Sequence, residues 1–340
     1  MLNGKSILIT GGAGEFGRIF VKKILWDYPD IKRIVIYSRD ELKQWDMQQE
    51  YPNSKYRMMR YFIGDVRDFD RLKRACEGID IVVHAAAMSQ VDVAEYNPEE
   101  CIKTNIEGVK NLIDACLVQN VHDVVMLSSD KACAPINLYG ATKLTAEKLF
   151  IAANNIKGSR NIRFSVVRYG NVMGSRGTVI PSFIKMRNDG AQNLPITDMN
   201  MSRFNITNQQ STGLVTWALA HHVGGEIFIP KVPSYHIIDM AKAIAPNLPL
   251  KVIGLRSGEK IHEEMITISD APNTIEVDKY YVIIPTNSVM YTREHYLNRY
   301  NGVAVPKDFS YTSDNNVEWE TVDTLREKIK KYVDPTFVVK

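Results

Sequence analysis

The stretch "SILITGGAGEFG", residues 6–17, decides the fold. Its apolar run at 6–10 is typical of a buried β-strand and leads directly into glycines at positions 11, 14 and 17. Glycine permits a tight turn, a close approach of the backbone to a pyrophosphate, and close packing of a helix on a strand. Because these glycines stand between an expected strand and an expected helix, we predict the first crossover of a dinucleotide-binding domain.

The N-terminus of the expected helix offers free N–H groups and a positive dipole end to the phosphates of a dinucleotide. The residues predicted to contact the cofactor in this turn are Thr10, Gly11, Gly14, Glu15, Phe16 and Gly17. We expect the carboxylate of Glu15 to face solvent, because an anion close to phosphates is unfavourable. A plain strand–helix turn is the alternative interpretation of the glycines.

Short apolar runs alternate with longer amphipathic ones from residue 5 to about residue 170. Expected strands lie at 6–10, 33–37, 60–64, 79–85, 123–129 and 163–169, and the clearest expected helix spans 98–120. This alternation indicates an α/β fold with a Rossmann-like, doubly wound parallel sheet. We predict an NADP-binding domain over 1–170, to which a strand and a helix return around 205–240. The irregular remainder, 171–340, is predicted to be mainly a smaller α/β substrate-binding region.

The end of the second strand, in "IYSRDELK", bears on which nicotinamide cofactor is bound. An NAD site usually has an acid here that accepts from both ribose hydroxyls. This chain has Ser38 and Arg39 instead, and an arginine beside a hydroxyl suits a 2′-phosphate, so NADP is predicted. NAD remains the alternative cofactor, because an acid, Asp40, follows directly and because Arg39 can also be read as a solvated surface charge. Asp65 and Val66, after the third strand, are placed to cover the adenine.

Composition argues against several classes of protein. The 340 residues carry a net charge of only +3, so nothing favours nucleic acid or an anionic membrane as a partner. The chain has no run of about eighteen apolar residues and no signal-peptide pattern at its start, so we expect a cytoplasmic protein. The four cysteines are scattered without metal-site spacing, so no metal is expected.

The stretch "SSDKACAPINLYGATK", residues 128–143, carries two pairs of proton-handling groups. Tyr139 and Lys143 are four apart at the start of an expected helix and share one face. A tyrosine has a pKa of about 10, and a nearby ammonium would lower it, so that Tyr139 can take a proton from a sugar hydroxyl. Ser129 supplies a hydroxyl at the strand end, and Asp130 and Lys131 form the second pair. We predict that these residues are catalytic.

Several motifs resemble those of a known family. "TGGAGEFG", "HAAA" (84–87) and "YGATK" (139–143) are similar to motifs of the extended short-chain dehydrogenases/reductases. Longer stretches, among them "YSRDELKQ", "FIGDVRD", "AEYNPEECIKTNI" and "VVRYGNVMGSRG", resemble the configuration-inverting UDP-N-acetylglucosamine 4,6-dehydratases. The likeness runs from residue 4 to about residue 319. It implies an NADP-dependent hydro-lyase that acts on a UDP-sugar.

The resemblance also implies a role for each catalytic residue. Tyr139, aided by Lys143 and Ser129, would deprotonate the C4 hydroxyl while hydride leaves C4 for the nicotinamide. Lys131 would then remove the proton from C5, and Asp130 would protonate the departing C6 hydroxyl, after which hydride returns to C6 and a proton to C5. Retaining dehydratases carry a glutamate in place of Lys131, so the lysine implies inversion at C5. We expect burial in a closed site near Lys143 and a bound cofactor to lower the pKa of Lys131 so that it can act as a base.

The same resemblance implies further contacts with the cofactor and the substrate. Ala85 and Ala86 would contact the cofactor, together with Tyr139, Lys143 and Asn171. The implied substrate contacts are Met88, Asn105, Asn171, Arg203, Arg256 and Glu259. The two arginines would clamp the diphosphate of UDP, because a guanidinium binds phosphate in a bidentate manner. The product would be UDP-2-acetamido-2,6-dideoxy-β-L-arabino-hex-4-ulose, a precursor for pseudaminic acid-type or other surface glycans.

Two departures from the family pattern keep other activities open. The segment Ser89-Gln90-Val91-Asp92 is more similar to the retaining dehydratases and the sugar 4-epimerases, so the hexose and the C5 stereochemistry stay undecided. Asn205 stands where the family has an aromatic residue. The alternatives are a C5-retaining UDP-sugar 4,6-dehydratase, a UDP-sugar 4-epimerase, and a nucleotide-binding scaffold or redox sensor without catalysis.

The helices expected at 98–120 and 139–153 are apolar over a broad stripe. In the extended family the equivalent pair forms a four-helix contact, so the resemblance implies a homo-oligomer, either a dimer or a hexamer. His221 and His222 are expected to cap a helix or lie on the surface, and not to form a competing site.

Overall fold

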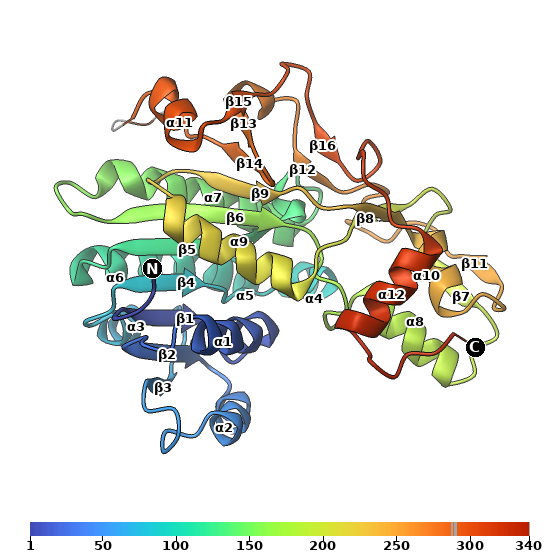
Figure 1. Cartoon of the computed structure of the whole chain (residues 1–340), viewed down its shortest axis with the longest axis horizontal. Helices are drawn as coiled ribbons and strands as arrows, with labels where there is room; N and C mark the ends of the chain where they lie inside the picture. Colours follow the sequence, from blue (N-terminus) through green and yellow to red (C-terminus); the bar gives the residue numbers. More distant parts are fainter. Residues whose placement is uncertain (287, 289–290, 340) are drawn as a thin grey trace.

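A large, mostly parallel sheet organises the computed structural model, which describes residues 1–286, 288 and 291–339 (Figure 1). Within these residues, ten strands form the sheet in the order β15-β13-β14-β9-β6-β5-β4-β1-β2-β3. The seven strands from β9 to β3 run parallel. The other three, β14, β13 and β15, extend the sheet beyond β9 by antiparallel pairing. The order 3-2-1-4-5-6 is that of a dinucleotide-binding sheet. The predicted fold class is confirmed.

The strands and helices have the following bounds. The strands of the large sheet are β1 (Ser6–Thr10), β2 (Arg33–Ser38), β3 (Met59–Ile63), β4 (Ile81–His84), β5 (Asp123–Ser129), β6 (Arg163–Tyr169), β9 (Ile227–Pro230), β13 (Thr274–Val277), β14 (Tyr280–Ile283) and β15 (Val303–Ala304). The helices before β6 are α1 (Glu15–Asp27), α2 (Glu41–Glu50), α3 (Phe69–Ala75), α4 (Val91–Tyr96), α5 (Pro98–Ile102), η1 (Lys103–Glu107), α6 (Gly108–Gln119), η2 (Asp130–Ala132) and α7 (Leu138–Ile156). The later helices are α8 (Val179–Asn188), α9 (Asn208–His221), α10 (Ile237–Ile244), η3 (Ala271–Asn273), α11 (Arg293–Tyr300) and α12 (Val322–Tyr332).

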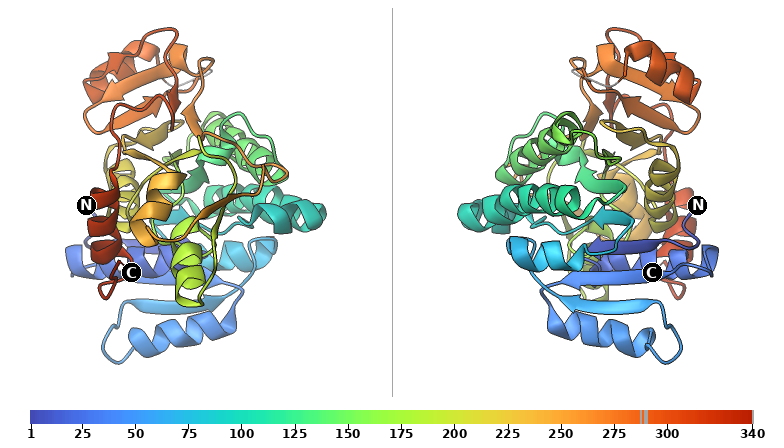
Figure 2. Two further views of the ribbon diagram at one scale, coloured as in Figure 1. Left: turned by 90° about the vertical axis from the view of Figure 1, so that its right-hand side faces the viewer. Right: turned by 90° about the vertical axis from the view of Figure 1, so that its left-hand side faces the viewer.

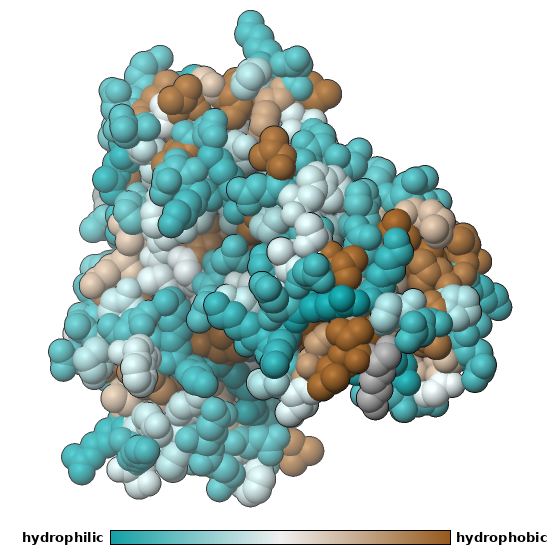
Figure 3. Space-filling view, turned by 45° about the vertical axis from the view of Figure 1, so that its right-hand side comes forward, coloured by the Kyte–Doolittle hydropathy of each residue, from teal (hydrophilic) through white to brown (hydrophobic). Residues whose placement is uncertain are grey.

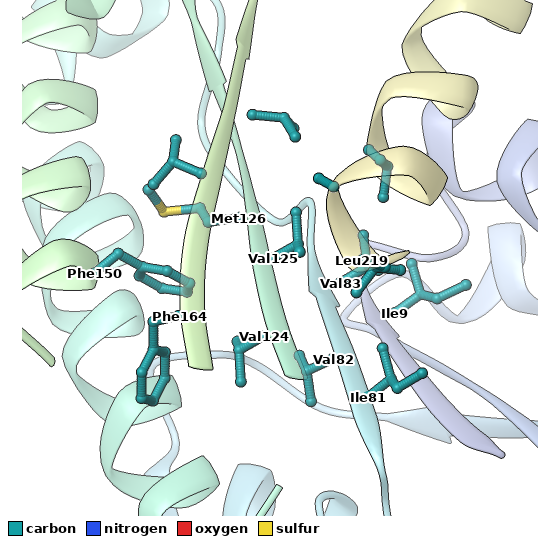
Figure 4. Packing of buried hydrophobic residues seen from close by; sticks show 14 of the residues in the cluster. Ile9, Ile81, Val82, Val83, Val124, Val125, Met126, Phe150, Phe164 and Leu219 are labelled. Atoms are coloured by element: carbon teal, nitrogen blue, oxygen red, sulfur yellow. The ribbon is translucent and has the colours of Figure 1, made fainter. Parts of the chain in front are cut away.

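Helices cover both faces of the sheet, so its central strands are buried on both sides. Figure 2 shows α3, α6 and α7 on one face and α1 and α9 on the other. Figure 4 shows how alternate residues divide between the faces: Met126 and Phe164 lie with Phe150 of α7, whereas Val83 and Val125 point toward α9. All of these side chains are fully buried. This two-sided burial explains the nearly continuous apolar runs that predicted the strands.

The helix expected at 98–120 is interrupted, which corrects the prediction. It consists of α5, a π-helical turn η1 and α6. Asn105 in the π turn accepts the N–H of Met88 (2.8 Å) and donates to the carbonyl of Met88 (3.0 Å) and to Thr142 Oγ1 (3.0 Å). The wider turn therefore lets one side chain, that of Asn105, form hydrogen bonds with both the loop after β4 and the helix α7. Apolar periodicity does not reveal it, because one π turn barely changes the buried stripe.

The start of α7 is defined by its N-cap, and this places the catalytic candidates. Asn137 accepts the N–H of Gly140 (2.7 Å) through its side chain, as an N-cap residue does. The helix consequently begins at Leu138, with Tyr139 in its first turn and Lys143 one turn later. A Cβ on Gly140 would lie 2.1 Å from the carbonyl oxygen of Lys131, so glycine allows α7 to pack against η2.

The C-terminal part adds a smaller lobe beside the carboxyl ends of the large sheet (Figures 1 and 3). It contains the two-stranded sheets β8 (Ser202–Phe204) with β10 (Ser234–His236) and β7 (Leu194–Ile196) with β11 (Leu250–Val252). A third two-stranded sheet, β12 (Glu264–Ile266) with β16 (Tyr311–Thr312), packs on the core of the large sheet. Helices α8, α10 and α12 share a second hydrophobic core with β7. Helix α9 and strand β9 return to the large sheet, as do β13 to β15.

Two further features concern the surface and the interior. Among the described residues, no helix combines the length and the apolar character needed to cross a membrane. His222 caps α9 as expected, but its ring is buried and not on the surface. It bonds Ser165 Oγ (2.8 Å) and Asp123 Oδ1 (3.1 Å), because a buried imidazole requires polar partners.

A fully buried ion pair joins α7 to β6. Arg168 donates to both carboxylate oxygens of Glu147, at 3.0 and 2.6 Å, and to the carbonyl of Met265 (2.8 Å). We expect Glu147→Gln to lower the free energy of unfolding by about 3 kcal/mol, because the buried guanidinium loses its hydrogen-bonded carboxylate and keeps only Asp270, 3.8 Å away and partly exposed. Urea denaturation measures this change. The matched substitution Asp27→Asn, in the partly exposed pair with Lys23, should cost only about 0.2–1 kcal/mol; equal losses in both variants would contradict the assignment.

Candidate active site

Two adjacent cavities lie at the carboxyl ends of the parallel strands. The larger, about 560 Å³, is bounded by the ends of β5 and β6, the start of α7 and segments of the smaller lobe. The second, about 300 Å³, lies against the glycine turn and the ends of β2, β3 and β4. Ala85 and Ala87 line both cavities, so the two are connected at the loop after β4. This edge is where open α/β sheets bind their ligands.

The glycine turn forms a cradle that side chains would fill. Gly11 has a φ of +65°, and a Cβ there would lie 2.9 Å from the backbone nitrogen of Ala86. A Cβ on Gly17 would lie 2.2 Å from the carbonyl oxygen of Gly12, so this glycine allows α1 to pack on the turn. Thr10 accepts the N–H groups of Ala85 and Ala86 and fixes the loop across from the glycines. The cradle fits a dinucleotide, and the plain-turn alternative does not explain the cavity beside it.

The predicted cofactor residues divide between the cavity wall and its support. Those that line the second cavity are Gly11, Gly14, Ser38, Arg39, Asp65, Val66, Ala85 and Ala86. Phe16 instead stacks on Phe20, and Thr10 and Gly17 support the turn from behind. Glu15 is exposed as expected, and its carboxylate accepts the N–H of Arg176 (3.2 Å).

The end of β2 presents both an arginine, Arg39, and an acid, Asp40, to the cavity. Arg39 lies 3.5 Å from Asp65 and is more than half exposed. Asp40 is occupied by its own helix, since one carboxylate oxygen accepts the N–H of Lys43 (2.9 Å) and the other pairs with the Lys43 ammonium (2.8 Å). Both interactions hold the pKa of Asp40 below its usual value. The carboxylate nearest the second strand is therefore committed to capping α2.

The catalytic candidates meet at the end of β5. Ser129 donates to Asp130 Oδ1 (2.8 Å), and Lys131 Nζ donates to the same oxygen (2.9 Å). Tyr139, Lys143, Ser129 and Lys131 line the larger cavity. Asp130 lies beneath them, almost fully buried, next to Gly170. A Cβ on Gly170 would lie 3.0 Å from Asp130 Oδ2, so the glycine makes room for this carboxylate, which itself does not line the cavity.

Lys131 is held by three acceptors at once. Besides Asp130, its Nζ donates to Asn171 Oδ1 (3.3 Å) and Glu263 Oε1 (3.2 Å). Burial by itself would lower the pKa of Lys131, but the carboxylates of Asp130 and Glu263 outweigh it and raise the pKa. The expected lowering is therefore wrong for this structure. The prediction considered desolvation and missed Glu263, which lies far away in the sequence.

The pKa of Tyr139 also differs from expectation. Burial raises it to about 12, while the Lys131 ammonium and the Ser129 hydroxyl act to lower it. Lys143 donates to the carbonyl of Leu127 (2.6 Å), and burial lowers its own pKa to about 8. The cation that favours the Tyr139 phenolate is thus Lys131 and not Lys143. For Asp130, burial and the charge of Glu263 raise the pKa, as suits a group that donates a proton.

The substrate candidates fall into two groups. Asn171, Arg203, Arg256 and Glu259 line the larger cavity, whereas Met88 and Asn105 are not among its lining residues. Met88 packs in a small cluster with Tyr139. The side-chain amide of Asn105 is already engaged in hydrogen bonds to Met88 and Thr142. These two residues shape the wall from behind, because the π turn directs Asn105 to the backbone of the loop.

Arg203 is buried and engaged by the loop beside it. Its guanidinium donates to the carbonyls of Ile261 and Lys260, both at 2.9 Å, and lies 3.6 Å from Glu259 and from Glu263. Glu259 in turn accepts the hydroxyl of Thr197 (3.1 Å). The cavity-lining residues that sequence reasoning missed include Arg176, Tyr235, Lys260 and Glu263. Among the described residues, no group of His, Cys, Asp and Glu is arranged to hold a metal ion.

Comparison with known proteins shows to which family the chain belongs. Residues 7–285 match the family described as polysaccharide biosynthesis protein. The chain belongs to this family. It is 52% identical to the UDP-N-acetylglucosamine 4,6-dehydratase (inverting) of Campylobacter jejuni subsp. jejuni serotype O:2, over 97% of the chain and 98% of the relative. This confirms the resemblance inferred from the motifs.

The chain is also similar to two other proteins. The UDP-glucose 4-epimerase of Rickettsia canadensis is 36% identical, over 96% of each chain. The X-ray structure of Pen from Bacillus thuringiensis superimposes with a TM-score of 0.86 at 37% identity, over 97% of this chain and 98% of that one. The fold is therefore shared with both a dehydratase and an epimerase branch, and only the site residues discriminate between the two.

The cradle at Gly11 leads to a direct test. We expect Gly11→Ala to abolish copurification of the nucleotide cofactor, because the added methyl meets backbone atoms that cannot move aside. The control is Gly4→Ala, whose φ of +75° imposes the same backbone strain with no atom within 4 Å of the new Cβ. Absorbance of released nucleotide and thermal melting are measured for both. Full cofactor content in Gly11→Ala would contradict the cradle.

Proposed function

We propose that this chain is a hydro-lyase that converts UDP-N-acetylglucosamine to its 4-keto-6-deoxy derivative with inversion at C5. The observation that carries the proposal is the contact of Asp130 with Lys131, which lines one cavity together with Tyr139. The 52% identity to an inverting dehydratase over nearly the whole chain supports it. The product is proposed to be UDP-2-acetamido-2,6-dideoxy-β-L-arabino-hex-4-ulose, for the synthesis of pseudaminic acid-type or other surface glycans.

The cofactor is proposed to be NADP, held by the residues that line the second cavity. Gly11 and Gly14 would approach the pyrophosphate, Ser38 and Arg39 the 2′-phosphate, and Asp65 with its neighbour Val66 the adenine. A bound nicotinamide supplies the capacity to accept a hydride and to return it. Asn171, Tyr139 and Lys143 lie in the larger cavity, where the nicotinamide end would meet the sugar.

The residues of the chain account for the proton transfers. Tyr139 takes the proton of the C4 hydroxyl, and the Lys131 ammonium and Ser129 hydroxyl stabilise its phenolate. The 4-ketone makes the proton on C5 acidic, and Lys131 takes this proton after its own has passed to Asp130, whose Oδ1 lies 2.9 Å away. Asp130, with its raised pKa, protonates the hydroxyl that leaves C6. Two proton-handling pairs are needed, one for the oxidation at C4 and one for the loss of water across C5 and C6.

The UDP moiety is proposed to bind along the cationic wall of the smaller lobe. Arg256 lines the cavity without the dense backbone contacts that hold Arg203. We assign Arg256 and Arg203 to the diphosphate and Glu259 to the uridine ribose. Arg176 and Lys260 extend the same positive wall.

The epimerase is the strongest rival, because a relative at 36% identity carries that name. A 4-epimerase requires a proton acceptor for one hydroxyl, and Tyr139 would suffice. It has no use for the Asp130–Lys131 pair, whose burial and mutual contact must be maintained at a cost. A retaining dehydratase is the second rival, and a scaffold without catalysis would have no need of any of these residues.

The chain is further proposed to act in the cytoplasm as a homo-oligomer. The helices from α4 to α6 carry apolar side chains that are substantially exposed, namely Val93, Tyr96, Ile102 and Val118. Figure 2 shows these helices protruding from the body. Exposed apolar side chains of this size on neighbouring helices suit a contact between two copies of the chain.

Cofactor choice is tested on the purified protein. Mass analysis of the released nucleotide should give NADP(H), and Arg39→Ala should weaken NADP binding by about tenfold or more, because a charge-assisted bond to the 2′-phosphate is lost. Arg67→Ala is the matched control, since Arg67 also pairs with Asp65 but does not line the cavity. Recovery of NAD alone, with no loss of preference in Arg39→Ala, would overturn the choice of NADP.

The reaction itself is tested with UDP-N-acetylglucosamine in deuterated water, without added cofactor. We expect deuterium at C5 and L-arabino ring couplings in the proton NMR spectrum of the product. Tyr139→Phe should block oxidation at C4, because the C4 hydroxyl loses its base. Lys131→Ala should permit oxidation but stop before water is lost, which a single-turnover trace at the absorbance of reduced nicotinamide would reveal.

Each contrary outcome points to a different enzyme. A D-xylo product would mean retention at C5, and the assignment of the chain as a dehydratase would still hold. Formation of the C4 epimer without water loss would assign the chain to the epimerases. Normal product release by Lys131→Ala would show that Lys131 is not the C5 base.

A further inference from the structure

Glu263 is a buried carboxylate that the sequence did not single out and the proton transfers above do not use. Its side chain is 5% exposed and lies 3.2 Å from the Lys131 ammonium. Its other oxygen, Oε2, is buried with no hydrogen-bond partner in the described part of the chain. A buried carboxylate oxygen without a partner is costly, so a purely structural role explains this residue poorly.

The backbone of Glu263 is held rigidly in place. Its N–H donates to Ser313 Oγ (2.9 Å), and its carbonyl accepts the N–H of Ser313 (2.7 Å). Ser313 Oγ also pairs with Ser202 Oγ (2.7 Å), and the following strand β12 is tied to β6 through Arg168 and the carbonyl of Met265. These hydrogen bonds fix the backbone of Glu263, so the C-terminal part of the chain directs its carboxylate at Lys131.

We propose that Glu263 is a positioning residue of the reaction, which holds the Lys131 ammonium against Asp130 and whose charge keeps the proton shared by that pair inside the site. Three acceptors, from Asp130, Asn171 and Glu263, match the three N–H groups of the ammonium. The inference rests on the proposed function, since it assigns the proton to the groups that act at C5 and C6.

The charge of Glu263 acts on both members of the pair in the same direction. It raises the pKa of Lys131 and also that of Asp130, because a negative neighbour stabilises an ammonium and destabilises a second carboxylate. The other charged or titratable groups that face this cluster are Arg203 from β8, Tyr235 from β10, Tyr139 from α7 and Lys260 from the loop before β12. Arg203 and Lys260 are cations and partly offset Glu263, so the neutral variant leaves a net positive surrounding.

The test is the pH profile of kcat/KM for the loss of water from UDP-N-acetylglucosamine. In Glu263→Gln, both limbs of the profile should move to lower pH by about one unit or more, because Lys131 and Asp130 lose the same negative neighbour. Glu263→Asp, which keeps the charge, should restore the limbs toward the parent. Glu264→Gln makes the same chemical change one residue away; in the described residues Lys131 pairs with Glu263 and not with Glu264, so its limbs should stay in place.

Two results would overturn the inference. Lower activity in Glu263→Gln with unmoved limbs would mean that the residue only supports the fold. A rise in KM alone would mean that Glu263 serves Arg203, which lies 3.6 Å away, and not Lys131.

A second measurement does not depend on turnover. Competitive acetylation of the folded protein at pH 8, read by mass spectrometry, reports the neutral fraction of Lys131, which lines the cavity. Labelling of Lys131 should rise severalfold in Glu263→Gln and stay unchanged in Glu264→Gln; equal labelling in both overturns the inference. A parent enzyme that releases no water at any pH overturns the proposed function instead, and the acetylation result then still decides whether Glu263 governs Lys131.

Discussion

Parallel pairing of β4, β5 and β6 is the constraint on which the site depends. Because these strands run in the same direction, their carboxyl ends meet at one edge, and the loops that follow them must share that edge. The pairing is stabilised by apolar side chains buried on both faces of the sheet (Figure 4). Ser129 ends β5 and Asp130 and Lys131 follow it directly in η2, so their positions derive from a rigid sheet and not from a flexible loop.

The second requirement is that the charges at this edge be paired when they are buried. Asp130, Lys131, Arg203 and Glu263 are all largely removed from water, and each of them has a partner of opposite charge in the group. An isolated charge in this position would be strongly destabilising. The smaller lobe supplies Arg203 and Glu263, so it completes the electrostatics of the site as well as the wall of the cavity.

This pairing reverses the simplest expectation for a lysine base. Desolvation would release a proton from Lys131, whereas the surrounding carboxylates retain it. In the proposed reaction, proton transfer at C5 would therefore depend on how substrate binding changes the surroundings of Lys131, and not on the lysine alone. The helical partner of Tyr139, Lys143, donates instead to the carbonyl of Leu127.

The sequence by itself determined the six strands from β1 to β6, the glycine turn and the stretch 128–143 as the candidate site. Each is a local pattern, since β-strands buried on both faces, a turn that requires a positive φ at Gly11 and a helix that begins after Asn137 all leave their mark within a few residues. Only the tertiary structure decided the partners of these groups. Glu263 reaches Lys131 across 132 positions of the chain, and Asn105 reaches Met88 through a π turn. A pKa depends on such neighbours through space, and a linear pattern carries no record of them.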